Sequence, residues 1–203
     1  MHISREEPEG SENAYLQVDF EGLKKVNLDV IAWIHIPALD ISYPVVQGKD
    51  NSYYLHHMFD GQENKNGSIF VDYHNRPDFT DSNTIVYGHN MKNGSMFGIL
   101  EQYQEQSLYQ RYPCFYIYRP GYILEYQIIS CYAGQNGSTG YTYSFPETEG
   151  FQKFLSTIQS YAGYDTGTEV TDSDHVITLS TCVNSDRNYR YLVHGKLTQK
   201  IQN

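Results

Sequence analysis

The sequence predicts a mainly β protein with peripheral helices, and three features lead to this fold class. Twenty tyrosines are spread over 203 residues, many in short aromatic or β-branched segments separated by Gly, Asn and Asp, a pattern typical of strands and turns. Pro120-Gly121 joins two such segments, as in a tight hairpin. Residues 176–182 and 190–197 have the pattern of two further strands, joined by a polar turn. The length suits one domain with a sizeable core.

The N-terminal residues divide into a spacer and a helix. Residues 1–12 are mostly polar, and we interpret them as a tag or spacer remnant that is flexible. A single folded domain is expected over residues 13–203. It should begin with an amphipathic helix over residues 13–26, capped by Ser11 and packed against one face of the sheet. The apolar residues at helical spacing are Leu16, Phe20, Leu23 and Val26.

Short strands are expected next along the chain. Their predicted ranges are residues 30–36, 41–46, 67–73 and 84–90. Pro44 places the second strand at a sheet edge or next to a bulge, because proline cannot donate a ladder hydrogen bond. Residues 51–58 predict a short helix or turn, and the last of these strands ends in Gly-His-Asn.

The second half of the chain predicts a hairpin and two helices. Ser95 can cap a helix that carries Met96 to Leu108 and ends before Pro113. The two hairpin strands are residues 114–118 and 122–132. After Pro146 a second helix separates the late strands, and its apolar stripe is Phe151, Phe154, Leu155 and Ile158.

The three cysteines cannot all pair, so at least one is free. A hairpin centred on Pro120-Gly121 places Cys114 opposite about residue 127, several residues short of Cys131. We therefore predict no disulfide. Cys114 and Cys131 are expected to be small buried hydrophobic residues, which leaves Cys182 as the cysteine with a chemical role.

Composition excludes several classes of partner. The net charge of −10 and the pI near 5.1 argue against nucleic acid and anionic membrane surfaces. The sequence contains no run of about 18 apolar residues, so it predicts no membrane-spanning helix. His56 and His57 are adjacent, so they would point to different sides of a helix or strand, and no further ligand lies at a metal-binding spacing. We expect no metal and no cofactor.

Cys182 is the candidate nucleophile. It lies at the end of a predicted strand, and Arg190 opens the next one. If the two strands pair, the guanidinium can stabilise a thiolate and donate hydrogen bonds to a developing oxyanion. Arg187 competes for this role, but Arg190 is preferred because it opens a strand. His89 follows a short apolar strand, where catalytic groups commonly lie, and is the candidate for proton transfer.

Other polar residues are weighed beside these three. Ser180 shares a strand face with Cys182, so we expect it to line a substrate groove, and Tyr143 is a weaker candidate for the same groove. Asp72 and Asn90 could each orient His89. A solvated or capping role is favoured for Asp72, and Asn90 should project away from its neighbour, so both are left outside the catalytic set.

Two local strings carry a specific resemblance to a known family. Thr178-Leu-Ser-Thr-Cys182, with an arginine eight residues on, and Tyr87-Gly-His-Asn-Met91 are similar to motifs of the sortase transpeptidases of Gram-positive bacteria. Trp33-Ile-His-Ile-Pro37 and the segment 41–47 resemble the opening of the barrel in class B sortases. The helix expected before the cysteine strand also favours class B, because class A members generally lack it. The resemblance covers most of residues 13–198.

The resemblance implies a sortase-type eight-stranded β-barrel with an N-terminal helix and an extra helix before the cysteine strand. It implies that Cys182 cleaves an NPxT-type C-terminal sorting signal of secreted proteins after Thr, through a thioester. His89 would protonate the leaving amine and deprotonate the incoming one, and Arg190 would hold the oxyanion. The implied partners are sorting-signal peptides and an amine of a peptidoglycan stem peptide or cross-bridge. The implied location is the extracellular face of the membrane, and we expect an N-terminal anchor to have been removed from this chain.

Several alternatives stay open. A cysteine peptidase would use the same groups with water as the acceptor, and a pilin-polymerising sortase would use a pilin lysine. An L,D-transpeptidase of peptidoglycan also uses Cys, His and Arg, but resembles a Ser-His-Gly-Cys pattern, whereas Ser180-Thr181 precede the cysteine here. A Tyr-rich surface binding module is the non-enzymatic alternative. The exact sorting motif and the accepting amine do not follow from the sequence.

Overall fold

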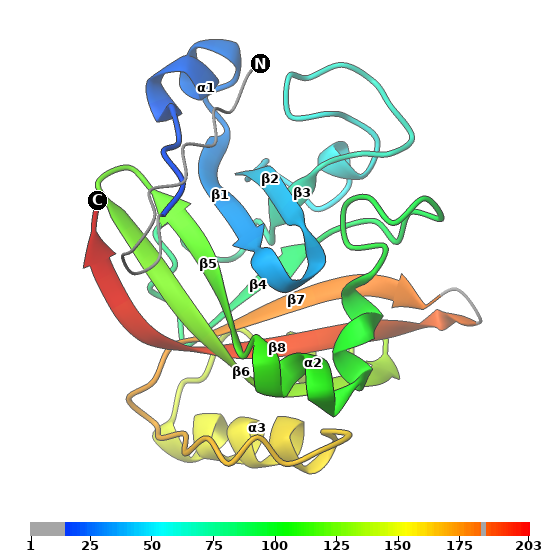
Figure 1. The fold of residues 1–203 in the computed structure, drawn as a ribbon, viewed down its shortest axis with the longest axis vertical. Helices are drawn as coiled ribbons and strands as arrows, with labels where there is room; N and C mark the ends of the chain where they lie inside the picture. The colour runs from blue at the N-terminus through cyan, green and yellow to red at the C-terminus, as the bar shows by residue number, and fades with distance from the viewer. Residues whose placement is uncertain (1–14, 184–185) are drawn as a thin grey trace.

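The computed structural model describes residues 15–183 and 186–203, apart from the side chain of Arg187. Over these residues eight strands close into a barrel in the order β1-β2-β3-β4-β7-β8-β6-β5 (Figure 1), which confirms the predicted fold class. The strands are β1 (Val30–Ile36), β2 (Ile41–Val46), β3 (Ile69–Val71), β4 (Asn83–Tyr87), β5 (Cys114–Arg119), β6 (Tyr122–Gln135), β7 (Val176–Val183) and β8 (Asp186–Gln202). The expected spacer, residues 1–12, lies outside the described residues.

The first two strands have the expected boundaries. Burial alternates along β1, because successive side chains of a strand point to opposite faces. Trp33 pairs with Pro44, and a bulge in β1 lies next to this pair, between Val30 and Ala32. The prediction that Pro44 stands beside a bulge is therefore confirmed. The predicted strand over 67–73 is shorter, since β3 spans only Ile69–Val71.

The N-terminal helix is shorter than predicted. α1 spans Phe20–Val26, and its N-cap is Asp19, whose carboxylate accepts a hydrogen bond from the Gly22 N–H at 2.8 Å. A helix start at residue 13 is wrong for the described part of that range, and the expected cap Ser11 lies outside it. Val26 is 54% exposed, and Leu23 is the buried residue of this helix.

The prediction of a helix from Ser95 to Leu108 is also wrong, because the backbone leaves the helical conformation at Met96. Met96 has a φ of +55°, a left-handed conformation that a continuous α-helix cannot contain. The Ser95 hydroxyl donates to the Asn93 side chain instead of capping a helix. A short 3-10 helix, η3 (Leu100–Gln104), is followed by α2 (Gln106–Arg111), which ends before Pro113 as expected.

The β5–β6 hairpin and the last helix follow the sequence pattern closely. Gly121 occupies the turn with a φ of +84°, and Cys114 pairs with Gln127 as predicted. The three cysteines are free thiols, with Cys131 buried and Cys114 only half-buried. Helix α3 (Thr148–Ser160) buries the expected stripe, made of Phe151, Phe154, Leu155 and Ile158.

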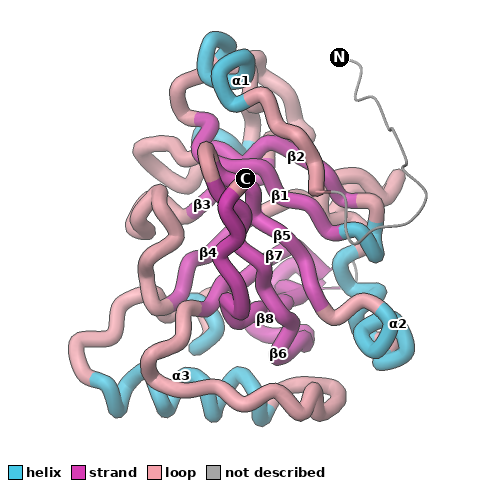
Figure 2. Tube along the Cα trace, turned by 60° about the vertical axis from the view of Figure 1, so that its left-hand side comes forward, coloured by secondary structure: helices cyan, strands magenta, loops and turns pink. Residues whose placement is uncertain are grey.

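Two hydrophobic layers position the C-terminal strands. The barrel interior covers one side of β7, and α3 lies across the end of the barrel beside β6 in both views (Figure 2). The stripe of α3 packs on a second core cluster made of Ile129, Tyr132, Val176 and Leu192. Consequently β7 is buried along residues 176–181, and it reaches solvent only near its end.

Candidate active site

Strand pairing brings the three predicted catalytic residues to one end of the barrel. β4 runs parallel to β7 with Tyr87 opposite Ser180, and β7 runs antiparallel to β8 with Cys182 opposite Arg190. The chain beyond Tyr87 continues beside β7, because the Gly88 N–H donates to the Ser180 carbonyl at 3.1 Å. His89 therefore lies at the level of Cys182, just beyond the buried part of β7.

Cys182 is the residue at which β7 emerges into solvent. Cys182 is exposed to solvent and its thiol is free, whereas the six residues before it are buried. The Asn90 side-chain amide donates to the Cys182 carbonyl at 2.6 Å, which ties the segment after β4 to the backbone of the cysteine. Asn90 thus acts on the backbone of Cys182. This contact agrees with leaving Asn90 out of the catalytic set.

His89 is fixed by its neighbours in a defined tautomer. Its Nε2 lies 2.9 Å from the carbonyl oxygen of Leu55, at the end of the 3-10 helix η2 (Tyr53–Leu55). A carbonyl can only accept, so Nε2 carries the hydrogen and Nδ1 is the basic nitrogen of the neutral ring. Residues 51–58 form the short turn that the sequence predicted, and this turn orients the imidazole.

Glycine is required before His89 because the backbone packs closely there. A Cβ on Gly88 would lie 2.5 Å from the ring of Phe97, which is fully buried. The Phe97 N–H in turn donates to the His89 carbonyl at 3.0 Å. The Gly-His step is therefore held against the core, which fixes the point from which the imidazole projects.

Arg190 lies on β8 directly across from the cysteine. Its side chain is half-buried, and Nη1 donates to the carbonyl of Tyr189 at 3.0 Å. The competing Arg187 belongs to β8, but its side chain lies outside the described residues, so the choice between the two arginines stays a prediction.

Ser180 is buried on β7, its place in a substrate groove stays a prediction, and its hydroxyl has a partner that the sequence did not suggest. It is 2% exposed, and its Oγ is 2.6 Å from the hydroxyl of Tyr141. Tyr141 belongs to η4 (Thr139–Tyr141), in the connection between β6 and α3. Burial raises the pKa of Tyr141, Ser180 and Arg190 oppose that rise, and Cys182 adds to it. The hydroxyl of Tyr141 thus contacts Ser180, which lies two residues before Cys182 on β7.

Tyr143, the tyrosine chosen from the sequence, lies two residues further on. Its ring stacks on His74, with ring centroids 4.9 Å apart and an angle of 17° between the planes. The role of Tyr143 in a groove stays a prediction, and the sequence did not single out Tyr141 in the same connection. The only local signal was the glycine before it, which permits a close approach to the barrel.

Asp72 is engaged away from His89. It is buried rather than solvated, and it caps a turn by accepting the His74 N–H. Its other oxygen accepts from Asn51 and from the Tyr87 hydroxyl. Burial alone would raise the pKa of Asp72, but the hydrogen bonds from His74, Tyr87 and Asn51 lower it overall. Its two oxygens are thus used for structure.

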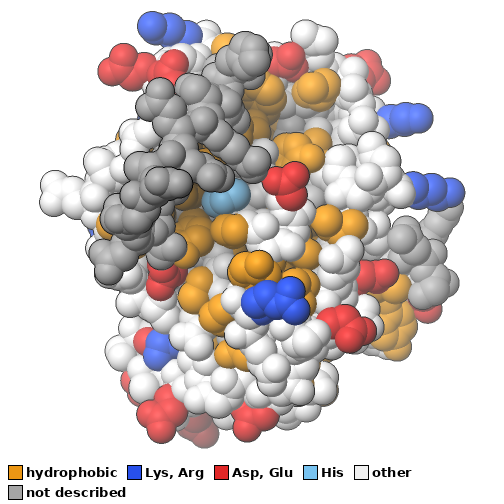
Figure 3. All heavy atoms as spheres, in the orientation of Figure 1, with side chains coloured by type: hydrophobic (Ala, Val, Ile, Leu, Met, Phe, Trp, Pro, Cys, Tyr) orange, Lys and Arg blue, Asp and Glu red, His pale blue; other side chains and the backbone are white. Residues whose placement is uncertain are grey.

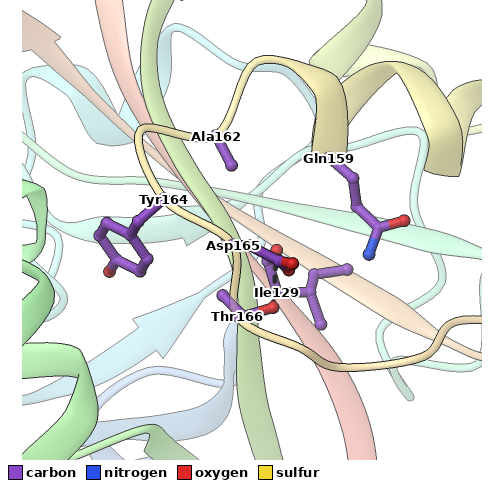
Figure 4. Close-up of a pocket in the computed structure, with 6 residues that line it drawn as sticks. All are labelled: Ile129, Gln159, Ala162, Tyr164, Asp165 and Thr166. Atoms are coloured by element: carbon purple, nitrogen blue, oxygen red, sulfur yellow. Dashed lines mark hydrogen bonds between the residues drawn. The ribbon is translucent and has the colours of Figure 1, made fainter.

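The pocket drawn in Figure 4 is separate from these residues. It has a volume of about 230 Å³ and is formed by β6, the end of α3 and the segment that follows α3. The Thr166 hydroxyl donates to the Ile129 carbonyl across it, at 3.4 Å. A second cavity, of about 250 Å³, lies between α3 and the connection that carries Tyr141.

Neither a metal-binding cluster nor a membrane-spanning helix is found among the described residues. Over the described residues, no cluster of three or more His, Cys, Asp and Glu side chains could hold a metal ion. Within the same residues, no helix has both the length and the apolar character needed to span a membrane. Figure 3 shows Lys and Arg side chains scattered singly over one face, with hydrophobic side chains gathered near its middle.

Several known proteins are similar to this chain in sequence and fold. The sortase domain family matches residues 34–198. Sortase B of Listeria monocytogenes is 37% identical over 194 residues, covering 93% of this chain and 77% of that protein. Clostridium perfringens sortase B has a TM-score of 0.84 at 33% identity, covering 88% of this chain and 99% of that one. A Staphylococcus aureus sortase B–substrate complex has a TM-score of 0.83 at 32% identity, covering 89% and 84%.

A closed barrel with an exposed cysteine opposite an arginine, matched along most of its length, defines the class: the chain belongs to the sortase family of cell-surface enzymes. Its relatives are class B members, and it is a sortase B-type cysteine transpeptidase. The resemblance inferred from the two sequence strings is confirmed.

Proposed function

We propose that Cys182, His89 and Arg190 carry out this transpeptidation, and that residues 13–203 form the catalytic domain. The observation that supports the assignment best is the strand register. Cys182 pairs with Arg190, and the segment after β4 is tied to the Cys182 carbonyl by Asn90 at 2.6 Å. A thiol can serve as the nucleophile, an imidazole as the proton carrier and a guanidinium as the oxyanion donor in acyl transfer through a thioester.

The reaction follows from the chemistry of the three groups. The Cys182 thiolate attacks the scissile carbonyl, and the Arg190 guanidinium donates hydrogen bonds to the resulting oxyanion. The C–N bond then breaks as His89 gives a proton to the leaving amine, which leaves a thioester on Cys182. An incoming amine attacks the thioester, His89 takes its proton, and the thiolate leaves.

The proposed donor is an NPxT-type sorting signal, cleaved after Thr. A substrate complex of the S. aureus relative supports a peptide ligand for this chain. Ser180 and Tyr143 are proposed to line the peptide groove. The proposed acceptor is an amine of a peptidoglycan stem peptide or cross-bridge, and the proposed location is the extracellular face of the membrane, through an N-terminal anchor.

The test uses NPxT-like and LPxT-like peptides, each mixed with diaminopimelate, lysine or a short glycine peptide, and identifies products by mass. The protein should join one peptide class to one amine, whereas Cys182→Ala should form no product. Cys114→Ala is the matched control and should remain active. Product formation by Cys182→Ala would contradict the assignment. Hydrolysis that no amine diverts would instead support a cysteine peptidase.

A further inference from the structure

A buried chain of polar groups links four barrel strands beneath the candidate site. Asn83 on β4, Thr178 on β7 and His194 on β8 are each 0% exposed. The Thr178 hydroxyl lies 2.8 Å from Asn83 Oδ1 and 2.9 Å from His194 Nδ1. His194 Nε2 lies 3.4 Å from the Tyr132 hydroxyl on β6. Burying polar groups in a core is costly unless they are hydrogen bonded, so such a network calls for a specific role.

The donors and acceptors allow one consistent arrangement. Thr178 has a single hydroxyl hydrogen, and it goes to Asn83 Oδ1 because an amide oxygen can only accept, whereas an imidazole nitrogen can donate. Thr178 must then accept from His194 Nδ1–H, which leaves Nε2 to accept from Tyr132. Burial lowers the pKa of His194 to about 3, so the ring is neutral, as this arrangement requires.

The network ends on the connection that carries Tyr141. With its oxygen used by Thr178, the Asn83 amide turns both hydrogens outward, to the Thr142 carbonyl at 2.9 Å and the Gly140 carbonyl at 3.3 Å. Gly140 sits directly on the barrel, since a Cβ there would lie 2.7 Å from Leu192 and 2.9 Å from the Tyr132 hydroxyl. The next residue, Tyr141, reaches Ser180 and stacks with Tyr87.

We infer that Asn83, Thr178 and His194 are positioning residues, which hold η4 on the barrel and thereby set Tyr141 against Ser180, two residues before Cys182 on β7. The inference rests on the proposed function of the Cys182 site. Tyr141 contacts the strand that carries the cysteine, whereas bonds are made and broken at Cys182 itself. Loosening the network should therefore weaken peptide binding more than it slows the chemical step.

The test compares two substitutions at one position with a matched control. Thr178→Val keeps the shape and removes the hydroxyl, and Thr178→Ser keeps the hydroxyl. Thr84→Val is the control, because Thr84 is a fully buried threonine on β4 whose hydroxyl has no hydrogen-bond partner among the described residues. One readout is hydrogen exchange over residues 136–145, where the N–H groups of Tyr141 and Thr142 are hydrogen bonded. The other is KM and kcat with the peptide and amine that give product.

Thr178→Val should raise exchange at Tyr141 and Thr142 and raise KM for the peptide roughly tenfold, with kcat changed less than about twofold. Thr178→Ser and Thr84→Val should match the unmodified protein. If Thr178→Val fails to fold, Gly140→Ala tests the same contact, because it displaces η4 without removing a hydrogen-bonding group.

Each contrary result has its own meaning. Unchanged exchange in Thr178→Val, or in Gly140→Ala if Thr178→Val does not fold, would overturn the anchoring. Raised exchange with an unchanged KM would overturn the role of the network in substrate binding. Absence of product from the unmodified protein with every peptide would refute the proposed function. The exchange measurement would then still decide whether the network anchors η4.

Discussion

Cys182 and Arg190 face each other across one rung of the β7–β8 ladder, so a single backbone register sets their spacing. Arg190 ends in a planar guanidinium, which differs in shape from the ammonium group of lysine. Its planar fork can offer two parallel N–H groups to one oxygen atom or to neighbouring oxygens of a peptide. At the scale of single residues, this makes Arg190 the residue whose shape, as well as charge, should matter.

Arg190→Ala is therefore expected to lower kcat for transfer by about 10²–10³, the effect of removing an oxyanion donor. Arg190→Lys should recover little of this loss, because an ammonium group lacks the fork. Steady-state kinetics with the productive peptide and amine measure both. Arg187→Ala is the matched control, and an equal loss there would show that the wrong arginine was chosen.

His194 makes a second prediction at this scale, for stability against pH. Burial lowers its pKa to about 3 in the folded protein, whereas an unfolded histidine titrates near ~6.5. The unfolded chain therefore binds the proton first as the pH falls. Stability from this residue is complete above pH ~6.5 and is lost below it, by about 2–3 kcal/mol at pH ~4.5.

Urea unfolding at a series of pH values from neutral to mildly acidic checks this expectation. His194→Gln should flatten the decline in the free energy of unfolding over that range. Ile158→Val, in the core cluster that His194 contacts through Tyr132 and Phe154, should lower the free energy by a similar amount at every pH. A decline that His194→Gln leaves unchanged would mean that another group binds the proton.

At the scale of elements, α3 belongs to the structure of the site although it carries none of the catalytic residues. It packs on β6, β7 and β8 through the second core cluster, so the connection before it lies between the barrel and the helix. Phe154 is central to this packing, since its ring contacts Phe145, Phe151 and His194. Loss of that ring should therefore be felt in both the helix and the connection.

Phe154→Ala is expected to lower the free energy of unfolding by about 3–5 kcal/mol, the usual cost of emptying an aromatic core position. Lys153→Ala, at an exposed neighbour, should change it by less than about 0.5 kcal/mol. Urea denaturation followed by circular dichroism measures both. A loss below about 1 kcal/mol for Phe154→Ala would show that α3 is not part of the cooperative core.

At the scale of the whole molecule, the barrel is closed by pairing between distant parts of the chain. β1 pairs with β5, and the parallel β4–β7 pair joins residues about 90 positions apart. The strands form one continuous hydrogen-bonded cylinder, so opening a seam between two strands exposes the barrel interior. The described residues should therefore unfold as one cooperative unit.

The single tryptophan makes this testable. Trp33 lies on β1 opposite Pro44 and Tyr118, and its indole donates to Ser42, so its fluorescence reports the β2–β1–β5 side of the barrel. We expect its urea transition to coincide with the transition seen by far-ultraviolet circular dichroism. Two separate midpoints would indicate that this side of the barrel unfolds independently.

The sequence by itself determined the local features: the bounds of β1 and β2, the buried stripe of α3, and the pairing of Cys114 with Gln127. These depend on side-chain periodicity and turn chemistry, which a short window of residues contains. It also carried the strings around Cys182 and His89, which identified the family.

Only the tertiary structure decided the rest. Barrel closure selects β7 as the partner of β4, and this pairing brings the Gly-His-Asn segment beside Cys182. The contact of Tyr141 with Ser180 likewise depends on neighbours far away in the sequence. The same holds for the left-handed conformation of Met96, whose N–H donates to the Tyr43 hydroxyl. The physical reason is that these positions are set by which surfaces pack together, and a local pattern of residues does not specify its distant partner.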